Sequence, residues 1–192
     1  MAELKLRRSL LYVPGNMPSM LQNIPLFNCD AIQIDLEDAV PYSEKDAARI
    51  LVRRFLEGYK NRNKEILVRI NGLDTKWALD DLKTVLPALP DGIRLPKADS
   101  PEIVERLDTL LTEYEEELGL DIGHFRILPS IETAEGVINA VATAGTALVA
   151  AGSTDTVSFR DAEDVTHTFA GTEAVQFGLA VMQWVSAHYA AA

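Results

Sequence analysis

Ionisable and amide side chains follow several short apolar runs of the sequence, at the points where those runs stop. These side chains are Asp35, Glu37, Asp38, Arg69, Asn71, Lys97, Glu132 and Asp155. Carboxylate oxygens are the ligands that Mg²⁺ prefers in proteins, and the planar fork of an arginine binds a carboxylate through two hydrogen bonds. The set therefore indicates metal-assisted chemistry on a substrate that carries a carboxylate.

Glu132 and Asp155 are the candidate metal ligands. They follow neighbouring expected strands, and Mg²⁺ needs only one or two protein carboxylates because water and substrate oxygens complete its octahedron. Each residue also has an ordinary interpretation. Glu132 can be an acidic residue in the first turn of a helix, where the dipole favours negative charge, and Asp155 can be a turn residue after Gly152.

Arg69 is the candidate clamp for a substrate carboxylate. The alternative is an ion pair with the acidic residues between 35 and 38, and the two roles are compatible. Glu37 and Asp38 are candidate site carboxylates at the end of an expected strand. Their alternative is plain solvation at that position, because two buried carboxylates are costly.

Short apolar runs alternate with segments of helical period, a pattern typical of parallel strands joined by crossover helices. The expected strands are 9–13, 31–36, 65–70, 92–96, 125–129 and 147–151. The expected helices are 43–58 with a capping box from Ser43, 77–86, 101–118, 134–141 and 172–189. Catalytic groups of α/β folds collect at the carboxyl ends of such strands, which is where the polar residues fall.

The composition favours one domain over residues 1–192, because the chain has 192 residues of which 47% are hydrophobic. Its 18 Lys and Arg against 29 Asp and Glu give a net charge of −11, which argues against binding to nucleic acid or to a membrane. No apolar run approaches the roughly 20 residues of a membrane span, and the N-terminus does not read as a signal peptide. The lone Cys29 fits a cytoplasmic protein.

Five segments together resemble the citrate lyase beta subunit family, the acyl-CoA carbon–carbon lyases that include malyl-CoA and citramalyl-CoA lyases. The segments are Arg8–Asn16, Ile34–Val40, Val68–Asn71, Leu95–Lys97 and Pro129–Gly136. Each is weak alone, but their order and spacing match those of a barrel. The resemblance is close over residues 7 to about 140, and Gly152–Asp155 resembles the family's metal-binding turn with Ala151 where a Phe is common.

The resemblance implies a (β/α)₈ TIM-barrel fold, bound Mg²⁺ and a homo-oligomer, with a trimer favoured. It implies that Arg69 holds the substrate carboxylate, that Glu132 and Asp155 bind the metal, and that Glu37 and Asp38 orient metal-bound water. Asn71 and Lys97 are further candidates for substrate binding. Lys97 would contact the thioester or the CoA phosphates, with a surface charge as its alternative.

The expected activity is Mg²⁺-dependent cleavage of a 3-hydroxyacyl-CoA thioester such as citryl-CoA, which yields acetyl-CoA and a 2-oxo acid. The chain encodes about six βα units, whereas such a barrel usually takes about 250 residues, so we expect the C-terminal part of the barrel to be lacking. One alternative is therefore a catalytically impaired barrel fragment or assembly subunit. The other is a metal-dependent aldolase that acts on free 2-oxo acids.

Overall fold

The computed structural model describes residues 7–59, 64–140, 156–160 and 166–170. The chain splits into two compact units. Unit 1 consists of Met1–Pro96 and Val104–Ser130, and unit 2 consists of Lys97–Ile103 and Ile131–Ala192. The assignment of residues 1–192 to a single domain stays a prediction.

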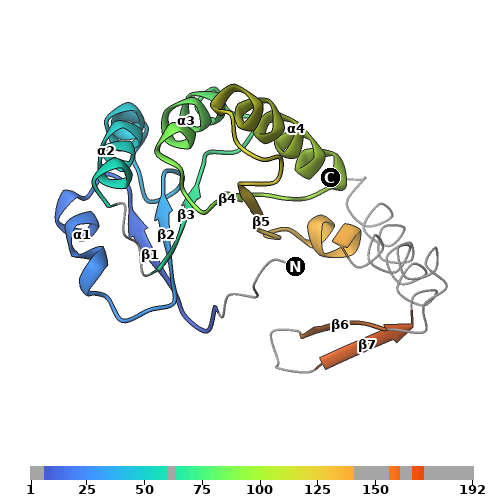
Figure 1. The fold of residues 1–192 in the computed structure, drawn as a ribbon. Coiled ribbons are helices and arrows are strands. Elements are labelled where there is room, and N and C mark those ends of the chain that lie inside the picture. Colours follow the sequence, from blue (N-terminus) through green and yellow to red (C-terminus); the bar gives the residue numbers. More distant parts are fainter. Residues whose placement is uncertain (1–6, 60–63, 141–155, 161–165, 171–192) are drawn as a thin grey trace. The chain divides into compact units, whose positions relative to one another are not determined.

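A five-stranded parallel sheet forms the centre of unit 1 (Figure 1). Its strands are β1 (Leu10–Pro14), β2 (Ala31–Asp35), β3 (Glu65–Arg69), β4 (Gly92–Leu95) and β5 (Arg126–Pro129). They lie side by side in chain order, and each neighbouring pair is parallel. The strands predicted between residues 9 and 129 are thus confirmed, with ends that differ by one residue.

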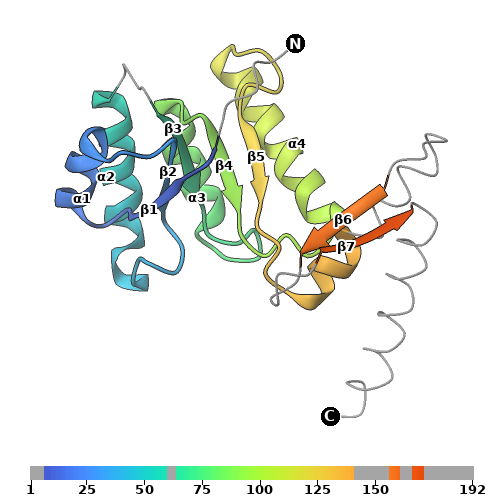
Figure 2. The same ribbon diagram turned by 90° about the horizontal axis from the view of Figure 1, so that it is seen from below.

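Helices connect these strands, as parallel pairing requires, and lie on one side of the sheet (Figures 1 and 2). They are α1 (Pro18–Asn23) with the 3₁₀ turn η1 (Ile24–Leu26), η2 (Tyr42–Glu44) with α2 (Lys45–Gly58), α3 (Ala78–Val85) with η3 (Leu86–Ala88), and α4 (Pro101–Leu118). The sequence does not predict α1, since 6 residues are too few to show a helical period. None of the described helices is both long and apolar enough to cross a membrane.

One face of the sheet is apolar and carries the core of unit 1. Alternate strand residues such as Val13, Ile34 and Val68 are fully buried on this face. The helices supply buried apolar side chains of their own, including Val52 and Leu82. Burial of these side chains between sheet and helices is the main stabilising contribution to the unit.

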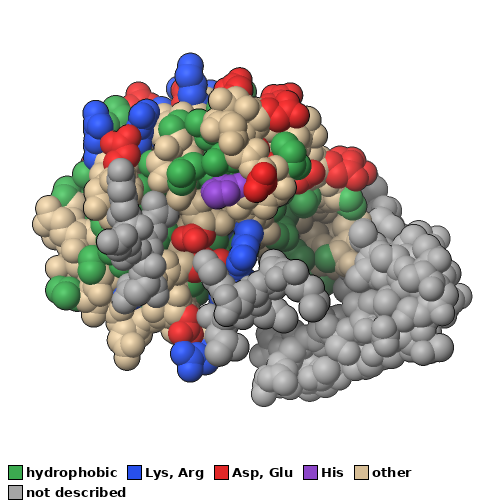
Figure 3. Space-filling model, in the orientation of Figure 1, with side chains coloured by type: hydrophobic (Ala, Val, Ile, Leu, Met, Phe, Trp, Pro, Cys, Tyr) green, Lys and Arg blue, Asp and Glu red, His purple; other side chains and the backbone are tan. Residues whose placement is uncertain are grey.

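The other face of the sheet carries the polar side chains of the strands, next to apolar ones such as Leu67. In the strand register Asp35 pairs with Arg69, and Arg69 pairs with Arg94, so these three side chains point to the same side. We call this side the polar face and define it by Gln33, Asp35, Glu65, Arg69, Arg94 and Arg126. Acidic and basic side chains also lie next to one another on the surface drawn in Figure 3.

The helix α2 begins without the capping box predicted at Ser43. Its N-cap residue is Glu44, with no hydrogen bond from the side chain to the helix, and Ser43 lies within the 3₁₀ turn η2. The carboxylate of Asp46, which would reach back in a capping box, instead accepts a hydrogen bond from Arg49. The prediction of a helix is confirmed, and the predicted cap is wrong.

Unit 2 contains a helix over 134–140, as predicted, and an antiparallel pair of strands. The strands are β6 (Thr156–Arg160) and β7 (Thr166–Ala170) (Figure 2). They are not predicted from the sequence, although the alternation of polar residues with Val157 and Phe159 is a strand signal. The strand predicted at 147–151 and the helix predicted at 172–189 lie outside the described residues.

Gly92 provides a test of the sheet. A Cβ atom there would lie 2.5 Å from the backbone oxygen of Arg126, so Gly92→Ala must push β4 and β5 apart. We expect a loss of about 1–3 kcal/mol in the free energy of unfolding, measured by urea titration. Gly58→Ala is the matched control, because a Cβ atom at the end of α2 meets nothing within 4 Å and alanine favours a helix. Equal stability of the two variants would contradict the close strand approach.

Candidate active site

The ends of β2 and β3 bring an arginine and three carboxylates together. Asp35 is the last residue of β2, and Glu37 and Asp38 follow it in the loop. Arg69 is the last residue of β3 and the register partner of Asp35. Nη1 of Arg69 lies 3.1 Å from Glu37 Oε2 and 3.6 Å from Asp38 Oδ2. These sequence-predicted residues therefore form one cluster.

Asp35 holds this cluster in place. Its two carboxylate oxygens accept hydrogen bonds from Nε and Nη2 of Arg69 at 2.8 and 2.6 Å. They also accept from the backbone N–H groups of Glu37 and Ala39 at 2.8 and 3.2 Å. Burial opposes ionisation of Asp35, but the Arg69 and backbone hydrogen bonds outweigh it and hold the pKa of this carboxyl below its usual value. Asp35 is thus an ionised structural partner of Arg69, which agrees with the ion pair that the sequence offers as the alternative for this arginine.

Arg69 is fixed in position by its carboxylate neighbours. The hydrogen bonds to Asp35 raise its pKa against the opposing effect of burial, so the guanidinium stays charged. Two of its three nitrogens are occupied by Asp35, and Nη1 is the edge that faces Glu37 and Asp38. The ion pair considered as an alternative for Arg69 therefore exists, and binding of a substrate carboxylate stays a prediction that concerns Nη1.

Glu37 and Asp38 differ in their surroundings. The side chain of Glu37 is 10% exposed and that of Asp38 is 79% exposed. Solvation alone therefore describes Asp38 but not Glu37, whose carboxylate is enclosed next to a guanidinium. An acid–base role in direct exchange with solvent is open to Asp38, and a role in fixing bound groups suits Glu37.

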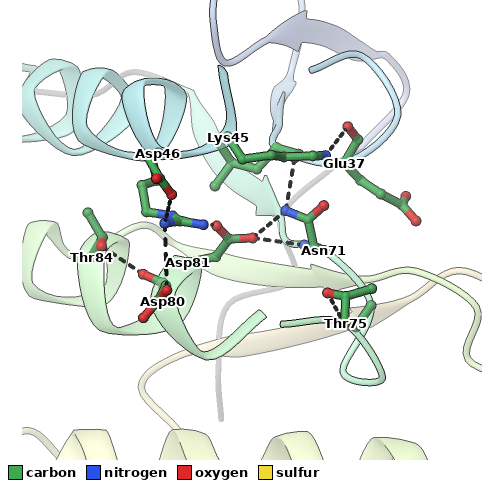
Figure 4. Close-up of polar contacts among 11 residues, drawn as sticks. Glu37, Lys45, Asp46, Asn71, Thr75, Asp80, Asp81 and Thr84 are labelled. Atoms are coloured by element: carbon green, nitrogen blue, oxygen red, sulfur yellow. Dashed lines mark hydrogen bonds and ion pairs between the residues drawn. The ribbon is translucent and has the colours of Figure 1, made fainter. Parts of the chain in front are cut away.

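Asn71 is buried and holds the site loop. Its Nδ2 donates to the backbone oxygen of Leu36 at 3.0 Å and to Asp81 Oδ2 at 2.6 Å, and its backbone N–H donates to the same Asp81 oxygen (Figure 4). Because both the amide nitrogen and the backbone of Asn71 are engaged inside the protein, its observed contacts position the end of β2. Its predicted role in substrate binding is not tested by these contacts.

Lys45 supports the same loop from α2 and was missed in the sequence. Its ammonium donates to the backbone oxygens of Leu36 and Glu37 at 2.7 and 2.6 Å (Figure 4). Burial lowers the pKa of Lys45, while Asp81 and the site carboxylates oppose that effect. In the sequence, a lysine at the start of a helix is indistinguishable from a surface charge. Only the structure shows that the Lys45 ammonium contacts the backbone of the loop.

Asp81 links α3 to the site through its hydrogen bonds with Asn71. This residue was also missed in the sequence. It is fully buried and accepts a hydrogen bond from Arg49 Nε at 2.9 Å in addition to those from Asn71 (Figure 4). Burial raises the pKa of Asp81, although the Asn71 and Arg49 hydrogen bonds lower it in part. The polar contacts therefore run from α2 and α3 to the loop that carries Glu37 and Asp38.

Lys97 and Glu132 belong to unit 2. Lys97 is exposed and has a left-handed backbone, with φ of 50°. Glu132 is exposed and precedes the helix 134–140, so it is not a first-turn residue of that helix. Near it, Thr133 Oγ1 donates to Asp99 Oδ1 at 2.6 Å and Asn139 Nδ2 donates to the Asp99 backbone oxygen at 2.6 Å.

Of the two candidate metal ligands, only Glu132 lies in the described part of unit 2. Within the described ranges no three His, Cys, Asp or Glu side chains are arranged to hold a metal ion, and Asp155 lies outside these ranges. Glu132 is an exposed carboxylate that makes no hydrogen bond or ion pair with another described residue. Mg²⁺ needs few protein ligands, so a solvent-facing carboxylate of this kind is suited to it.

A family model for HpcH/HpaI aldolase/citrate lyase matches residues 8–178. The chain belongs to this family. Residues 8–178 include all the candidate site residues, and the resemblance seen in the sequence is confirmed. Within the HpcH/HpaI aldolase/citrate lyase family, two curated relatives and one solved structure illustrate the likeness.

The chain is 43% identical over 137 residues to the citrate lyase subunit beta of Leuconostoc mesenteroides subsp. cremoris, and the match covers 71% of this chain and 45% of that protein. It is 33% identical over 135 residues to the mitochondrial citramalyl-CoA lyase of Homo sapiens, covering 69% of this chain and 39% of that protein. The chain thus spans less than half the length of these relatives.

Among solved structures, the citrate lyase beta subunit of M. tuberculosis complexed with oxaloacetate and magnesium matches with a TM-score of 0.53 and 20% identity. The match covers 90% of this chain and 73% of that one. This likeness shows the fold, an α/β fold of the (β/α)₈ TIM-barrel type. The predicted fold class is confirmed.

The ion pair between Asp35 and Arg69 predicts how stability depends on pH. Because the pKa of Asp35 is lowered on folding, its ionised form stabilises the protein above the unfolded pKa of about 4, and this contribution is lost as the pH falls through the folded value. We expect Asp35→Asn to lower the free energy of unfolding by about 3 kcal/mol near neutral pH, since it leaves Arg69 without its main partner.

The difference between wild type and Asp35→Asn should shrink below about pH 4, as measured by urea unfolding across a pH series. Asp81, whose raised pKa acts in the opposite sense, is present in both proteins and cancels in the comparison. Asp108→Asn on the exposed side of α4 is the control, with a change below about 0.5 kcal/mol at every pH. A difference for Asp35→Asn that is constant with pH would contradict the ionised pair.

Proposed function

We propose that the chain acts as a Mg²⁺-dependent carbon–carbon lyase that cleaves a 3-hydroxyacyl-CoA thioester such as citryl-CoA to acetyl-CoA and a 2-oxo acid. Membership in the HpcH/HpaI aldolase/citrate lyase family supports this proposal, as do relatives named citrate lyase subunit beta and citramalyl-CoA lyase. The higher identity to the citrate lyase subunit favours a citryl-like substrate.

The arrangement around Arg69 is the single observation that carries the proposal. The guanidinium is oriented by Asp35 on one edge, and its Nη1 faces the loop of Glu37 and Asp38 at the carboxyl end of the sheet. A substrate carboxylate would bind at Nη1, in competition with the weaker contacts of Glu37 and Asp38. Orientation before binding reduces the entropy that is lost on forming the complex.

The reaction requires a base for the substrate hydroxyl group. Both oxygens of Asp35 are engaged with Arg69 and with backbone N–H groups, which leaves Glu37 and Asp38 as the carboxylates of the cluster that can accept a proton. As the hydroxyl proton moves to one of these two carboxylates, the carbon–carbon bond breaks and the hydroxyl carbon becomes the carbonyl of the 2-oxo acid. The electron pair stays on the carbon next to the thioester, and protonation of this enolate gives acetyl-CoA.

Glu132 and Asp155 would hold the Mg²⁺ ion. When bound, the ion supplies Lewis acidity towards the oxygens of the fragment that leaves as the 2-oxo acid. The exposed position of Glu132 and its lack of bonds to described residues support a ligand role. Lys97, also exposed in unit 2, is proposed to contact the CoA thioester. A homo-oligomer, with a trimer favoured, and a cytoplasmic location stay predictions.

Glu132 gives a direct test of the metal proposal. We expect wild-type protein to release 2-oxo acid from citryl-CoA only with Mg²⁺, and Glu132→Gln to reduce this release to the level without the ion, because a neutral amide is a poor ligand. Glu135→Gln, an exposed glutamate three residues further on, is the matched control and should keep wild-type activity. Binding of Mn²⁺ in place of Mg²⁺, followed by electron paramagnetic resonance, should weaken in Glu132→Gln alone.

Equal metal binding and activity in both variants would remove Glu132 from the metal site. Comparison of the thioester with the corresponding free acid separates the lyase from an aldolase that acts on free 2-oxo acids. Cleavage of the free acid at the same rate would favour the aldolase.

Arg69→Lys tests the clamp. Lysine keeps the charge but loses the planar fork, so the group can no longer bind Asp35 through two hydrogen bonds and present a third nitrogen to substrate. We expect kcat/KM for citryl-CoA to fall at least about 100-fold, measured by steady-state kinetics. Arg53→Lys, which changes an ion pair with Glu57 on the surface of α2, should leave kcat/KM within about twofold. A similar small effect for Arg69→Lys would exclude Arg69 from the clamp role.

A further inference from the structure

Arg94 is an arginine of the polar face that the sequence-based site did not include. It lies on β4 as the register partner of Arg69, so the two side chains point to the same side from neighbouring strands about 4.8 Å apart. Nε of Arg94 donates to Ser130 Oγ at 2.5 Å. Ser130 is buried and its own backbone N–H donates to Leu95 at 2.8 Å, so the anchor of the guanidinium is itself held by the sheet.

The charge balance of the polar face sets Arg94 apart from its other arginine members. Arg126 lies 3.2 Å from Glu65, which it shares with Arg7, and Arg69 is paired with Asp35. Arg94, in contrast, makes no ion pair with a carboxylate of any described residue, and its terminal amino groups donate to none of them. Asp35, Glu37 and Asp38 lie within 4 Å of the Arg69 guanidinium and balance its charge. Arg94 has no such partner among the described residues, so an anion bound there would supply its missing counter-charge.

We propose that Arg94 binds a second carboxylate of the substrate and thereby selects compounds that release a dicarboxylic 2-oxo acid. This inference rests on the proposed function, in which Nη1 of Arg69 binds the first carboxylate. Anchoring of Nε by Ser130 leaves both terminal amino groups of Arg94 to donate to an anion. Two arginines in register on neighbouring strands then offer separate sites for the two carboxylates of one small molecule.

The chemistry of the cleavage makes this selectivity measurable. Citryl-CoA releases oxaloacetate, which has two carboxylates, whereas malyl-CoA releases glyoxylate, which has one. A residue that binds the second carboxylate therefore contributes to the cleavage of citryl-CoA. It has no group to bind in malyl-CoA. Arg94 would thus act on specificity, while the residues that perform bond cleavage serve both substrates.

The test compares both thioesters in wild type, Arg94→Gln and Arg94→Lys. We expect kcat/KM for citryl-CoA to fall roughly 10- to 100-fold in Arg94→Gln, with a change below about twofold for malyl-CoA. Arg94→Lys should recover part of the loss, because it restores the charge without the fork. Arg126→Gln is the matched control from the same face, since Arg126 already has a carboxylate partner, and the ratio of the two kcat/KM values should stay that of wild type.

A merely structural Arg94 would lower the two kcat/KM values equally, and that outcome would overturn the inference while the proposed function stands. An unfolded variant would also lose activity on both thioesters, and circular dichroism identifies this case. The ratio of the two kcat/KM values in Arg94→Lys then tests the inference. Ser130→Ala should shift the same ratio by a smaller factor, because it loosens Arg94 without removing it.

If wild type cleaves neither thioester, the proposed function fails and the inference is judged by binding. Isothermal titration with oxaloacetate and with pyruvate in the presence of Mg²⁺ measures the contribution of the second carboxylate. We expect wild type to bind oxaloacetate at least about tenfold more tightly than pyruvate, and Arg94→Gln to lose that preference. Equal affinities in wild type would overturn the inference.

Discussion

The bidentate ion pair between Asp35 and Arg69 is the interaction on which the rest of the site depends. It joins the last residues of two neighbouring strands, so the strand register itself sets its geometry. The same carboxylate accepts the backbone N–H groups of Glu37 and Ala39, which places the following loop next to the guanidinium. One carboxylate therefore orients the arginine and shapes the loop that carries the candidate acid–base residues. Such a group costs free energy to bury, and its four hydrogen bonds offset that cost.

The loop after β2 is held by contacts from α2 and α3 as well as by Arg69 of β3. Lys45 donates to two of its backbone oxygens, and Asn71 donates to one of them while it is fixed by Asp81. These contacts satisfy the Leu36 carbonyl group next to the strand end and add to the hydrogen bond that the Glu37 carbonyl accepts from the Val40 N–H. They also limit the motion of Glu37, so the position of its carboxylate is determined by α2, α3 and two strands together. Site geometry of this precision is easier to maintain on regular elements than on free loops.

The fold was largely predictable because its signals are local. Alternation of apolar runs with helical segments marks five strands to within one residue, and turn residues such as Gly58 mark helix ends. The polar residues at strand ends were found for the same reason, since Arg69, Glu37 and Asp38 follow apolar runs directly. Lys45 and Asp81 were missed because their partners lie on other elements, and within its own helix each resembles a surface charge. The capping box at Ser43 was wrong because a 3₁₀ turn, which the sequence pattern does not reveal, precedes α2.

Arg94 carries a sequence signal of its own. An arginine within the short apolar run of β4 is unusual, because charged side chains are rarely placed on a sheet without a partner. The polar face explains how it is tolerated: Asp35 pairs with the neighbouring Arg69, and Glu65 pairs with Arg126 and Arg7, whereas Arg94 has no carboxylate partner among the described residues. A guanidinium without a carboxylate partner, next to an oriented arginine, is suited to bind an anion. It can therefore discriminate between substrates whose released acid has two carboxylates and those whose released acid has one. The strands would then determine which acid is accepted, and the loop after β2 would supply the groups that react with it.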